Sequence, residues 1–343
     1  MSVDLRESVS LMGIDLDGLF EQAIRIQSQC TDYNVTNATS RNMWVDEHTC
    51  KLLYTPDGLS ASEGRSVEMT QHSLSQLCAK LGVPVRYIDK CIDSGRLDLA
   101  ADNLNSWLED YGKNLFIREY NNVVRGVLSD RFSVLDTPNI LEVLADSIDL
   151  DEYKVKGHFL SPERFHARII QRQQMNIEGE DLFAGIQIDS SDVGRSVLLV
   201  QFFIYKQVCT NGLVLPKSGG MLFQQKHIGI DKGHFRDGLK QSLSSIPLLI
   251  ENATNLIEEA RSQEGKYDFK RYTEQQMKDF IERMKMKAHL SEEGVGKVIQ
   301  LMTNTYGSST WGLVNSLTEV AQDYTLERRI EIEKVAGDIL SVA

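Results

Sequence analysis

The stretch NLFIREYNNVVRGVLSDR, residues 114–131, has the pattern of a β-hairpin. Two runs of apolar and β-branched residues are separated by Asn121 and Asn122, and asparagine tolerates the positive φ that a two-residue hairpin turn requires. The turn fixes the register of the two strands, because the residues that flank it, Tyr120 and Val123, then form the first pair. The stretch therefore predicts an antiparallel ladder in the middle third of the chain.

The predicted register brings two arginines together. With the turn at the two asparagines, Arg118 lies directly opposite Arg125 and Phe116 opposite Val127, all on one side of the sheet. Like charges that oppose each other across a ladder destabilise it, so we expect a neighbouring carboxylate or an external anion to neutralise the pair. The hairpin is therefore the first candidate for an anion-binding surface.

The composition is that of an ordinary soluble globular protein. At 343 residues, with 41% hydrophobic and 25% charged residues, the chain can form one large domain or two smaller ones. Its five cysteines include no C-x-x-C pair, which argues against disulfides or a zinc site and for a reducing compartment. The sequence contains no signal-peptide pattern and no stretch that approaches the roughly 18 apolar residues of a membrane span. We expect a cytoplasmic protein that does not act on membranes.

The negative charge is distributed unevenly along the chain. The formal net charge is −12, which argues against a protein that binds nucleic acid through bulk charge. Residues 1–112 carry 9 basic and 17 acidic side chains, residues 241–343 carry 12 and 16, and residues 113–240 carry 16 of each. A positive surface is therefore easiest to form in the middle third.

Three regions follow from the hydrophobic periodicity. Residues 1–112 are predicted to be mostly helical, residues 113–235 to form the core of an antiparallel sheet, and residues 236–343 to form a helical region. The run 196–208 is apolar on both faces, as expected of a central strand. The fold class is thus α+β, with a central antiparallel sheet flanked by an amino-terminal helical segment and a carboxy-terminal helical bundle. The expected late helices span residues 236–261, 273–290, 291–303 and 310–340.

Two helix boundaries are marked by local signals. Asp136 followed by Thr137 and Pro138 predicts a cap and the first turn of a helix. The last long helix is expected to break near Asp323, and Thr325 is a candidate cap for its second half.

One stretch of the first region is similar to a helix-turn-helix. Residues 74–95, LSQLCAKLGVPVRYIDKCIDSG, place Gly82 in the turn and Arg86, Tyr87 and Lys90 on the second helix. Two short helices around a glycine are also common as a plain packed pair. A DNA-reading role and a structural role both stay open.

Several strings together resemble a known family, the phage- and plasmid-associated proteins of unknown function that occur on prophages, conjugative plasmids and other mobile elements. The likeness spans residues 70 to about 330 and implies a setting in mobile elements, but no activity, cofactor or catalytic residue. A weaker likeness, at the level of a strand-rich middle followed by long helices, is to phage single-strand annealing proteins that bind DNA as rings. The strings are QLCAKLGVP, LNSWL, VRGVLSDRFSVLD, SSDVG, VCTNGL, KHIG and TWGLVNSLTEVAQ.

Common catalytic and cofactor motifs are absent from the sequence. Neither the phosphate loop GxxxxGK[ST] nor the nucleophile motif G-x-S-x-G occurs. His227 and His234 lie at no standard metal-ligand spacing. Asp130 beside Arg131 is compatible with a catalytic carboxylate next to a phosphate clamp, but such a pair is more often a salt bridge at a strand end. We therefore expect no cofactor and no metal, and we lean against an enzyme.

Cations and rings alternate in the middle third. Single-stranded nucleic acid is bound by such mixtures, because phosphates attract cations and bases stack on aromatic faces. The alternative is that the arginines pair with acidic neighbours such as Glu119, Glu163, Glu178, Glu180 or Asp181 and only solvate the sheet. The candidate residues are Phe116, Arg118, Tyr120, Arg125 and Arg131 around the hairpin, Arg164, Arg168 and Arg172 on one face of a predicted strand, and Lys206, Lys217, Lys226 and Arg236 beyond it.

These observations favour a cytoplasmic, mobile-element protein that binds single-stranded nucleic acid, as a homo-oligomer, to anneal or protect it. The first alternative is a protein-interaction factor that inhibits a host defence protein or acts as a decoy for it. An acidic surface suits such a role. A helix-turn-helix DNA binder and an enzyme are further alternatives. The sequence leaves open DNA versus RNA, the subunit number and the identity of a host partner.

Overall fold

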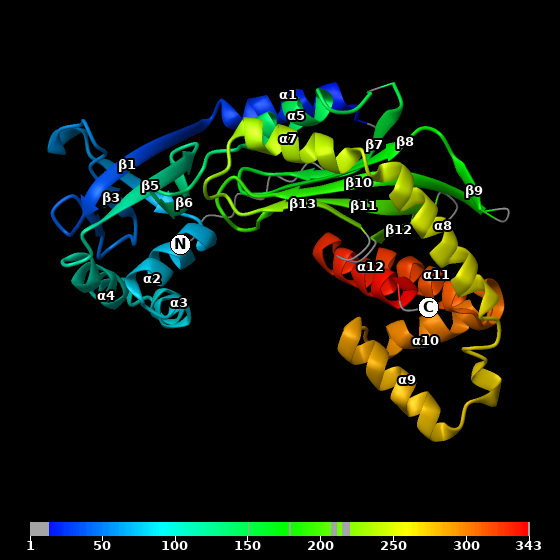
Figure 1. Ribbon diagram of the computed structural model, residues 1–343. Helices are drawn as coiled ribbons and strands as arrows, with labels where there is room; N and C mark the ends of the chain where they lie inside the picture. Colours follow the sequence, from blue (N-terminus) through cyan, green and yellow to red (C-terminus); the bar gives the residue numbers. More distant parts are fainter. Residues whose placement is uncertain (1–13, 150, 178–179, 207–210, 215–219, 342–343) are drawn as a thin grey trace.

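The computed structural model describes residues 14–149, 151–177, 180–206, 211–214 and 220–341. Its strands form two sheets, one of six strands and one of seven, and helices cover both (Figure 1). The predicted α+β class is confirmed, with an amino-terminal helix and a carboxy-terminal region of several helices. The antiparallel sheet expected as one unit is two separate sheets.

The first sheet belongs to an amino-terminal lobe. Its neighbours pair antiparallel, except that β4 and β6 run parallel. Three helices pack on it, α2 (Gln71–Leu81), α3 (Val85–Asp93) and α4 (Leu97–Leu108), and share a core with the strands (Figure 1). The boundary expected at residue 112 falls inside this lobe, because strands from both sides of it pair. In spatial order the strands are β1 (Cys30–Ala38), β5 (Lys113–Tyr120), β6 (Val123–Ser129), β4 (Arg65–Met69), β3 (Leu52–Tyr54) and β2 (Met43–Val45), and a short helix η1 (Ala61–Glu63) precedes β4.

The hairpin β5–β6 forms with the predicted turn but with a shifted register. Asn121 and Asn122 have φ of 47° and 60°, and Tyr120 pairs with Val123 as expected. A bulge beyond Glu119 then places Arg118 opposite Gly126, so the predicted opposition of two arginines is wrong. Phe116 likewise pairs with Leu128 instead of Val127.

The extra residue in this bulge is Arg125, since Glu119 pairs with Val124 and Arg118 with Gly126. Gly126 sits where another segment approaches closely. A Cβ atom at this position would lie 3.1 Å from Val193 of the second sheet's loop. The bulge therefore lies where the lobe meets the second sheet.

The second sheet is antiparallel throughout its described pairs. The apolar run predicted as a central strand is β11, which has partners along both edges, as expected. The spatial order is β12 (Asn211–Val214), β11 (Leu198–Lys206), β10 (Glu180–Ser190), β8 (Phe165–Gln171) and β7 (Tyr153–Leu160), with β13 (Met221–Gln225) paired to β11 and β9 (Met175–Ile177) to β10.

Helices lie on both faces of the second sheet (Figure 1). The upper face in Figure 1 carries α1 (Leu16–Gln27), α5 (Thr137–Ala145) and α7 (Lys232–Leu243), and α8 (Ile246–Ser262) continues from α7 toward the other face. The lower face meets the carboxy-terminal helices. Of these helices, α11 (Thr310–Val320) and α12 (Leu326–Ser341) contact β12, while α10 (Glu292–Leu301) packs on α11 and α9 (Glu274–Lys287) packs on α10. The short helix η2 (Phe269–Arg271) precedes α9, η3 (Met302–Tyr306) follows α10 and η4 (Ala321–Asp323) follows α11.

Helix breaks follow the sequence signals in part. The break expected near Asp323 is confirmed, because η4 ends there and α12 begins at Leu326. The helix expected over 236–261 is instead two helices, because α7 ends at Leu243 and α8 begins at Ile246, with Pro247 in its first turn. In the described part of the chain, no helix has the length and apolarity to cross a membrane.

Candidate functional site

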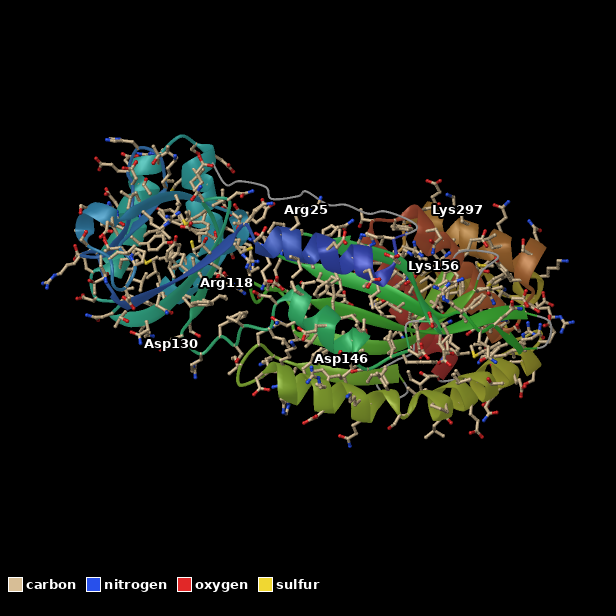
Figure 2. All side chains as sticks on the ribbon, turned by 90° about the horizontal axis from the view of Figure 1, so that it is seen from above. Arg25, Arg118, Asp130, Asp146, Lys156 and Lys297 are labelled. Carbon is tan, nitrogen blue, oxygen red and sulfur yellow. The ribbon has the colours of Figure 1, made fainter. Side chains whose placement is uncertain are left out.

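Arg118, the centre of the predicted anion surface, is buried and fully engaged. Only 1% of it is exposed. Its Nε and Nη2 donate to both carboxylate oxygens of Asp32 at 2.9 Å, and its Nη1 and Nη2 donate to Asp136 at 2.6 and 2.7 Å. Burial acts to lower the pKa of this guanidinium, but the hydrogen bonds to Asp136 and Asp32 outweigh it and raise the pKa. Figure 2 shows Arg118 at the border between the lobe and the second sheet.

Arg125 is buried in the same place. It is 1% exposed, its Nη1 donates to the carbonyl of Pro162, and its guanidinium lies 3.8 Å from Asp192. The prediction that the two hairpin arginines form an external anion surface is therefore wrong, because internal oxygens hold both. We call Arg118, Arg125, Asp32, Asp136 and Asp192 the interlobe cluster.

The interlobe cluster holds two guanidinium groups and three carboxyl groups. Asp192 is the third carboxyl, and its Oδ1 accepts hydrogen bonds of 3.1 Å from the backbone and hydroxyl of Thr137. Burial, followed by repulsion from Asp136, raises the pKa of Asp192 to about 7. The cluster joins the lobe to both α5 and the β10–β11 loop, so its first role is structural.

Arg168, the middle cation of the stripe predicted on β8, is turned inward. Phe165 and Ala167 face the core as expected, but Arg168 on the other face is 6% exposed and pairs with Glu333 of α12. Its Nε donates to Gln187 at 2.9 Å. An Arg sealed in this way does not present its charge to a ligand.

The remaining candidates are dispersed. Tyr120 is buried, Arg164 is half-buried and Arg172 and Arg131 are exposed. Lys206 pairs with Glu180 at 2.8 Å, and Arg236 with Asp146 at 2.9 Å. Lys217 lies outside the described residues. Three of the acidic neighbours named as alternative partners do hold cations, since Glu119 binds Arg65, Glu163 binds Arg195, and Glu180 binds Lys206 and Arg261.

An open hollow lies at the same junction between the lobe and the second sheet, apart from the interlobe cluster. It has a volume of about 540 Å³ and is lined by α2 of the lobe, the end of β6, Phe132, and residues 194–197 and 226–228 of the second half. A second hollow of about 460 Å³ shares Val197, Lys226 and Ile228 with it, so the two adjoin. We call the two hollows together the groove.

Three cations from separate segments line the groove. Lys80 comes from α2, Arg195 from the β10–β11 loop and Lys226 from the position directly after β13. Lys226 and Arg195 are exposed, although Arg195 also binds Glu163 at 2.7 Å. Burial lowers the pKa of Lys80, and Lys113 adds to this while Asp130 opposes it. Of the predicted nucleic-acid-binding residues that the structure describes, only Lys226 lines the groove.

A stack of rings forms one wall of the groove. Phe132 packs on His227 with ring centres 5.3 Å apart at 15°, and on Phe116 at 6.3 Å and 25°. In the described part of the chain, no three histidine, cysteine or acidic side chains are grouped as a metal ion would require.

The helix-turn-helix pair forms as expected, with Gly82 left-handed at φ 72°. However, α2 also contacts the second sheet's loop, because Gln76 donates to the carbonyl of Val193 at 2.8 Å. Arg86, Tyr87 and Lys90 are exposed on α3. Its DNA-reading role stays a prediction.

A family model described as a domain of unknown function, DUF932, matches residues 124–337. The chain belongs to the DUF932 family. No curated protein and no solved structure matches the chain. The DUF932 region begins in β6 and contains every wall of the groove except α2, which brings Lys80 from outside it.

Proposed function

We propose that the protein binds single-stranded nucleic acid in the groove. The observation that carries the proposal is the convergence of Lys80, Arg195 and Lys226, from three separate segments, on one open hollow. Cations placed along an open groove attract a phosphate backbone, and each neutralised phosphate releases counterions. The proposed site is thus the groove and not the hairpin surface predicted from the sequence, although the proposed ligand class, single-stranded nucleic acid, is the same.

The charges of the whole molecule favour a thin ligand over a duplex. The net charge of −12 repels nucleic acid away from the groove, and Glu163 and Asp130 reduce the positive charge at its margins. A single strand follows a narrow groove with one backbone, whereas a rigid duplex brings two phosphate chains to the acidic surface. The volume of the groove is in the range of ligand sites in proteins.

The biological setting is part of the proposal. The likeness to phage- and plasmid-associated proteins supports a strand that belongs to a mobile element and is met in the cytoplasm, where several subunits bind along it to anneal or protect it.

The experiment is a titration of labelled single-stranded oligonucleotides, one of DNA and one of RNA, followed by fluorescence anisotropy. The double change Lys80→Ala with Lys226→Ala is expected to weaken binding by roughly tenfold or more, since it removes two cation–phosphate contacts. Lys240→Ala is the matched control, because Lys240 is an exposed lysine on α7 and is not among the residues that line the groove. Wild-type protein that binds neither strand, or a double variant that binds as well as the control, contradicts the proposal.

The protein-interaction alternative stays a prediction. The large exposed apolar side chains Trp107, Leu248 and Met286 lie on three different helices, α4, α8 and α9. Purification of the protein with a host protein in place of nucleic acid would favour this alternative.

A further inference from the structure

The rings of the groove are occupied by one another. Phe132 is packed nearly parallel to both His227 and Phe116, and the Arg118 guanidinium lies 5.9 Å from the centre of its ring. His227 is only 5% exposed. A base needs a free ring face to stack on, and in this stack the ring faces are covered by one another.

Two buried polar atoms at the groove, by contrast, have no partner of their own. Ser196 Oγ and His227 Nδ1 are inaccessible to water and make no hydrogen bond to any described residue, although both side chains line the groove. A buried polar atom without a partner is destabilising by about 1–3 kcal/mol, so its persistence points to a ligand. Burial also lowers the pKa of His227 and so favours the neutral ring, whose Nε2 lies 3.4 Å from Ser190 Oγ.

Each of these atoms stands next to a cation in the sequence. Arg195 precedes Ser196, and Lys226 precedes His227, so the two segments repeat one arrangement of a charge and a neutral hydrogen-bonding group. Phosphate oxygens accept hydrogen bonds from neutral donors and cations alike. Lys80 of α2 supplies a third positive charge to the same groove.

From this arrangement we infer that the groove recognises the phosphate groups of its ligand and not the bases. In the bound state Arg195 and Lys226 hold one phosphate between them, and Lys80 holds a neighbouring one. Ser196 Oγ and His227 Nδ1 are sealed in the free protein and become exposed to the first phosphate as it binds. The inference rests on the proposed function and adds that binding is independent of base sequence.

The test compares three ligands of similar length by competition: an oligothymidylate, an abasic strand with the same sugar-phosphate backbone, and inorganic polyphosphate. If stacking carried the affinity, loss of the bases would weaken binding by about 5- to 150-fold for each stacked base. The expected result is that the abasic strand binds within about threefold of the oligothymidylate. A larger loss overturns the inference and leaves the proposed function standing.

Ser196→Ala distinguishes the donor site from charge alone. The variant keeps every cation of the groove and is expected to weaken both strands equally, by about tenfold, because a hydrogen bond to a charged group is lost. Unchanged binding by Ser196→Ala, with the fold intact by circular dichroism, overturns the phosphate site. Binding of polyphosphate but of neither strand would keep the phosphate site and contradict the proposed function, whereas binding of none of the three contradicts both.

Discussion

Arg118 of β5 and Asp136 at the start of α5 form a two-pronged ion pair across the junction of the lobe and the second sheet, with N–O distances of 2.6 and 2.7 Å. Asp136 is in the cap position of α5, but its side chain does not cap the helix. Its carboxylate is directed instead to the guanidinium. The pair therefore contributes to the joining of the two halves and not to a ligand site.

Arg118→Ala is expected to destabilise the fold by about 3–5 kcal/mol, because it leaves Asp136 buried without its partner. The measurement is the free energy of unfolding in urea. Arg86→Ala on the exposed face of α3 is the control and is expected to stay within about 0.5 kcal/mol of wild type. An Arg118→Ala protein as stable as this control would contradict the structural role.

The pH dependence of stability is expected to report Asp192. Its pKa is about 7 in the folded protein and about 3.9 in an unfolded chain, so the folded state holds a proton that the unfolded state has released between these values. The contribution of Asp192 to the free energy of unfolding should therefore be highest below about pH 4. It should fall as the pH rises through 7, by at most about 4 kcal/mol in total.

Asp192→Asn removes that titration while it keeps an oxygen for the hydrogen bonds from Thr137. Urea unfolding at pH 5, 6, 7 and 8 should give a flatter dependence for the variant than for wild type. Identical slopes for the two proteins would show that Asp192 is ionised in the folded state over this whole range. The charged groups around it are Arg118, Arg125 and Asp136.

Contact between the halves is also expected to depend on Gly126. Gly126→Ala adds a Cβ atom 3.1 Å from the side chain of Val193 and should destabilise the fold by about 1–3 kcal/mol. The double change with Val193→Ala should recover part of this loss, since it removes the opposing methyl groups. Thermal unfolding of the single and double variants measures the coupling, and strictly additive effects would mean that the two residues do not clash.

Arg168 is expected to fix α12 to the second sheet. Arg168→Met leaves Glu333, which is fully buried, with Arg329 as its remaining ion-pair partner in the described chain, and should cost about 3–5 kcal/mol. Adding Glu333→Leu should restore most of the stability, because an apolar pair replaces the ion pair. A double variant less stable than Arg168→Met alone would argue against this pairing.

Local signals in the sequence predicted much of the fold. Asn121 and Asn122 gave the hairpin turn, and the doubly apolar run gave β11, because these features depend on neighbours in the chain. The bulge at Arg125 could not be predicted in this way. It lies against Val193, which is far along the sequence, and a shift of one residue moves every later side chain of the strand.

The candidate site was harder to predict for the same reason. Of its three cations, Lys226 stood out in a basic stretch, while Lys80 reads as an ordinary helix residue and Arg195 as a turn residue. Only the packing of α2 against the second sheet's loop brings them to one groove. The alternation of charged and apolar residues along β8 predicted an exposed stripe. The sequence of β8 alone does not show that α12 covers this face at Arg168.

The most direct test of nucleic-acid binding in the groove is the slope of log affinity against log salt concentration for a single-stranded oligonucleotide, measured between about 50 and about 200 mM salt. Two neutralised phosphates, one held by Arg195 and Lys226 and the other by Lys80, predict a slope of about −1.4 for wild type, since each neutralised phosphate on a single strand contributes about −0.7. The Lys80→Ala, Lys226→Ala double variant should give about −0.7. A slope that is the same in both proteins, or near zero in wild type, would contradict the account.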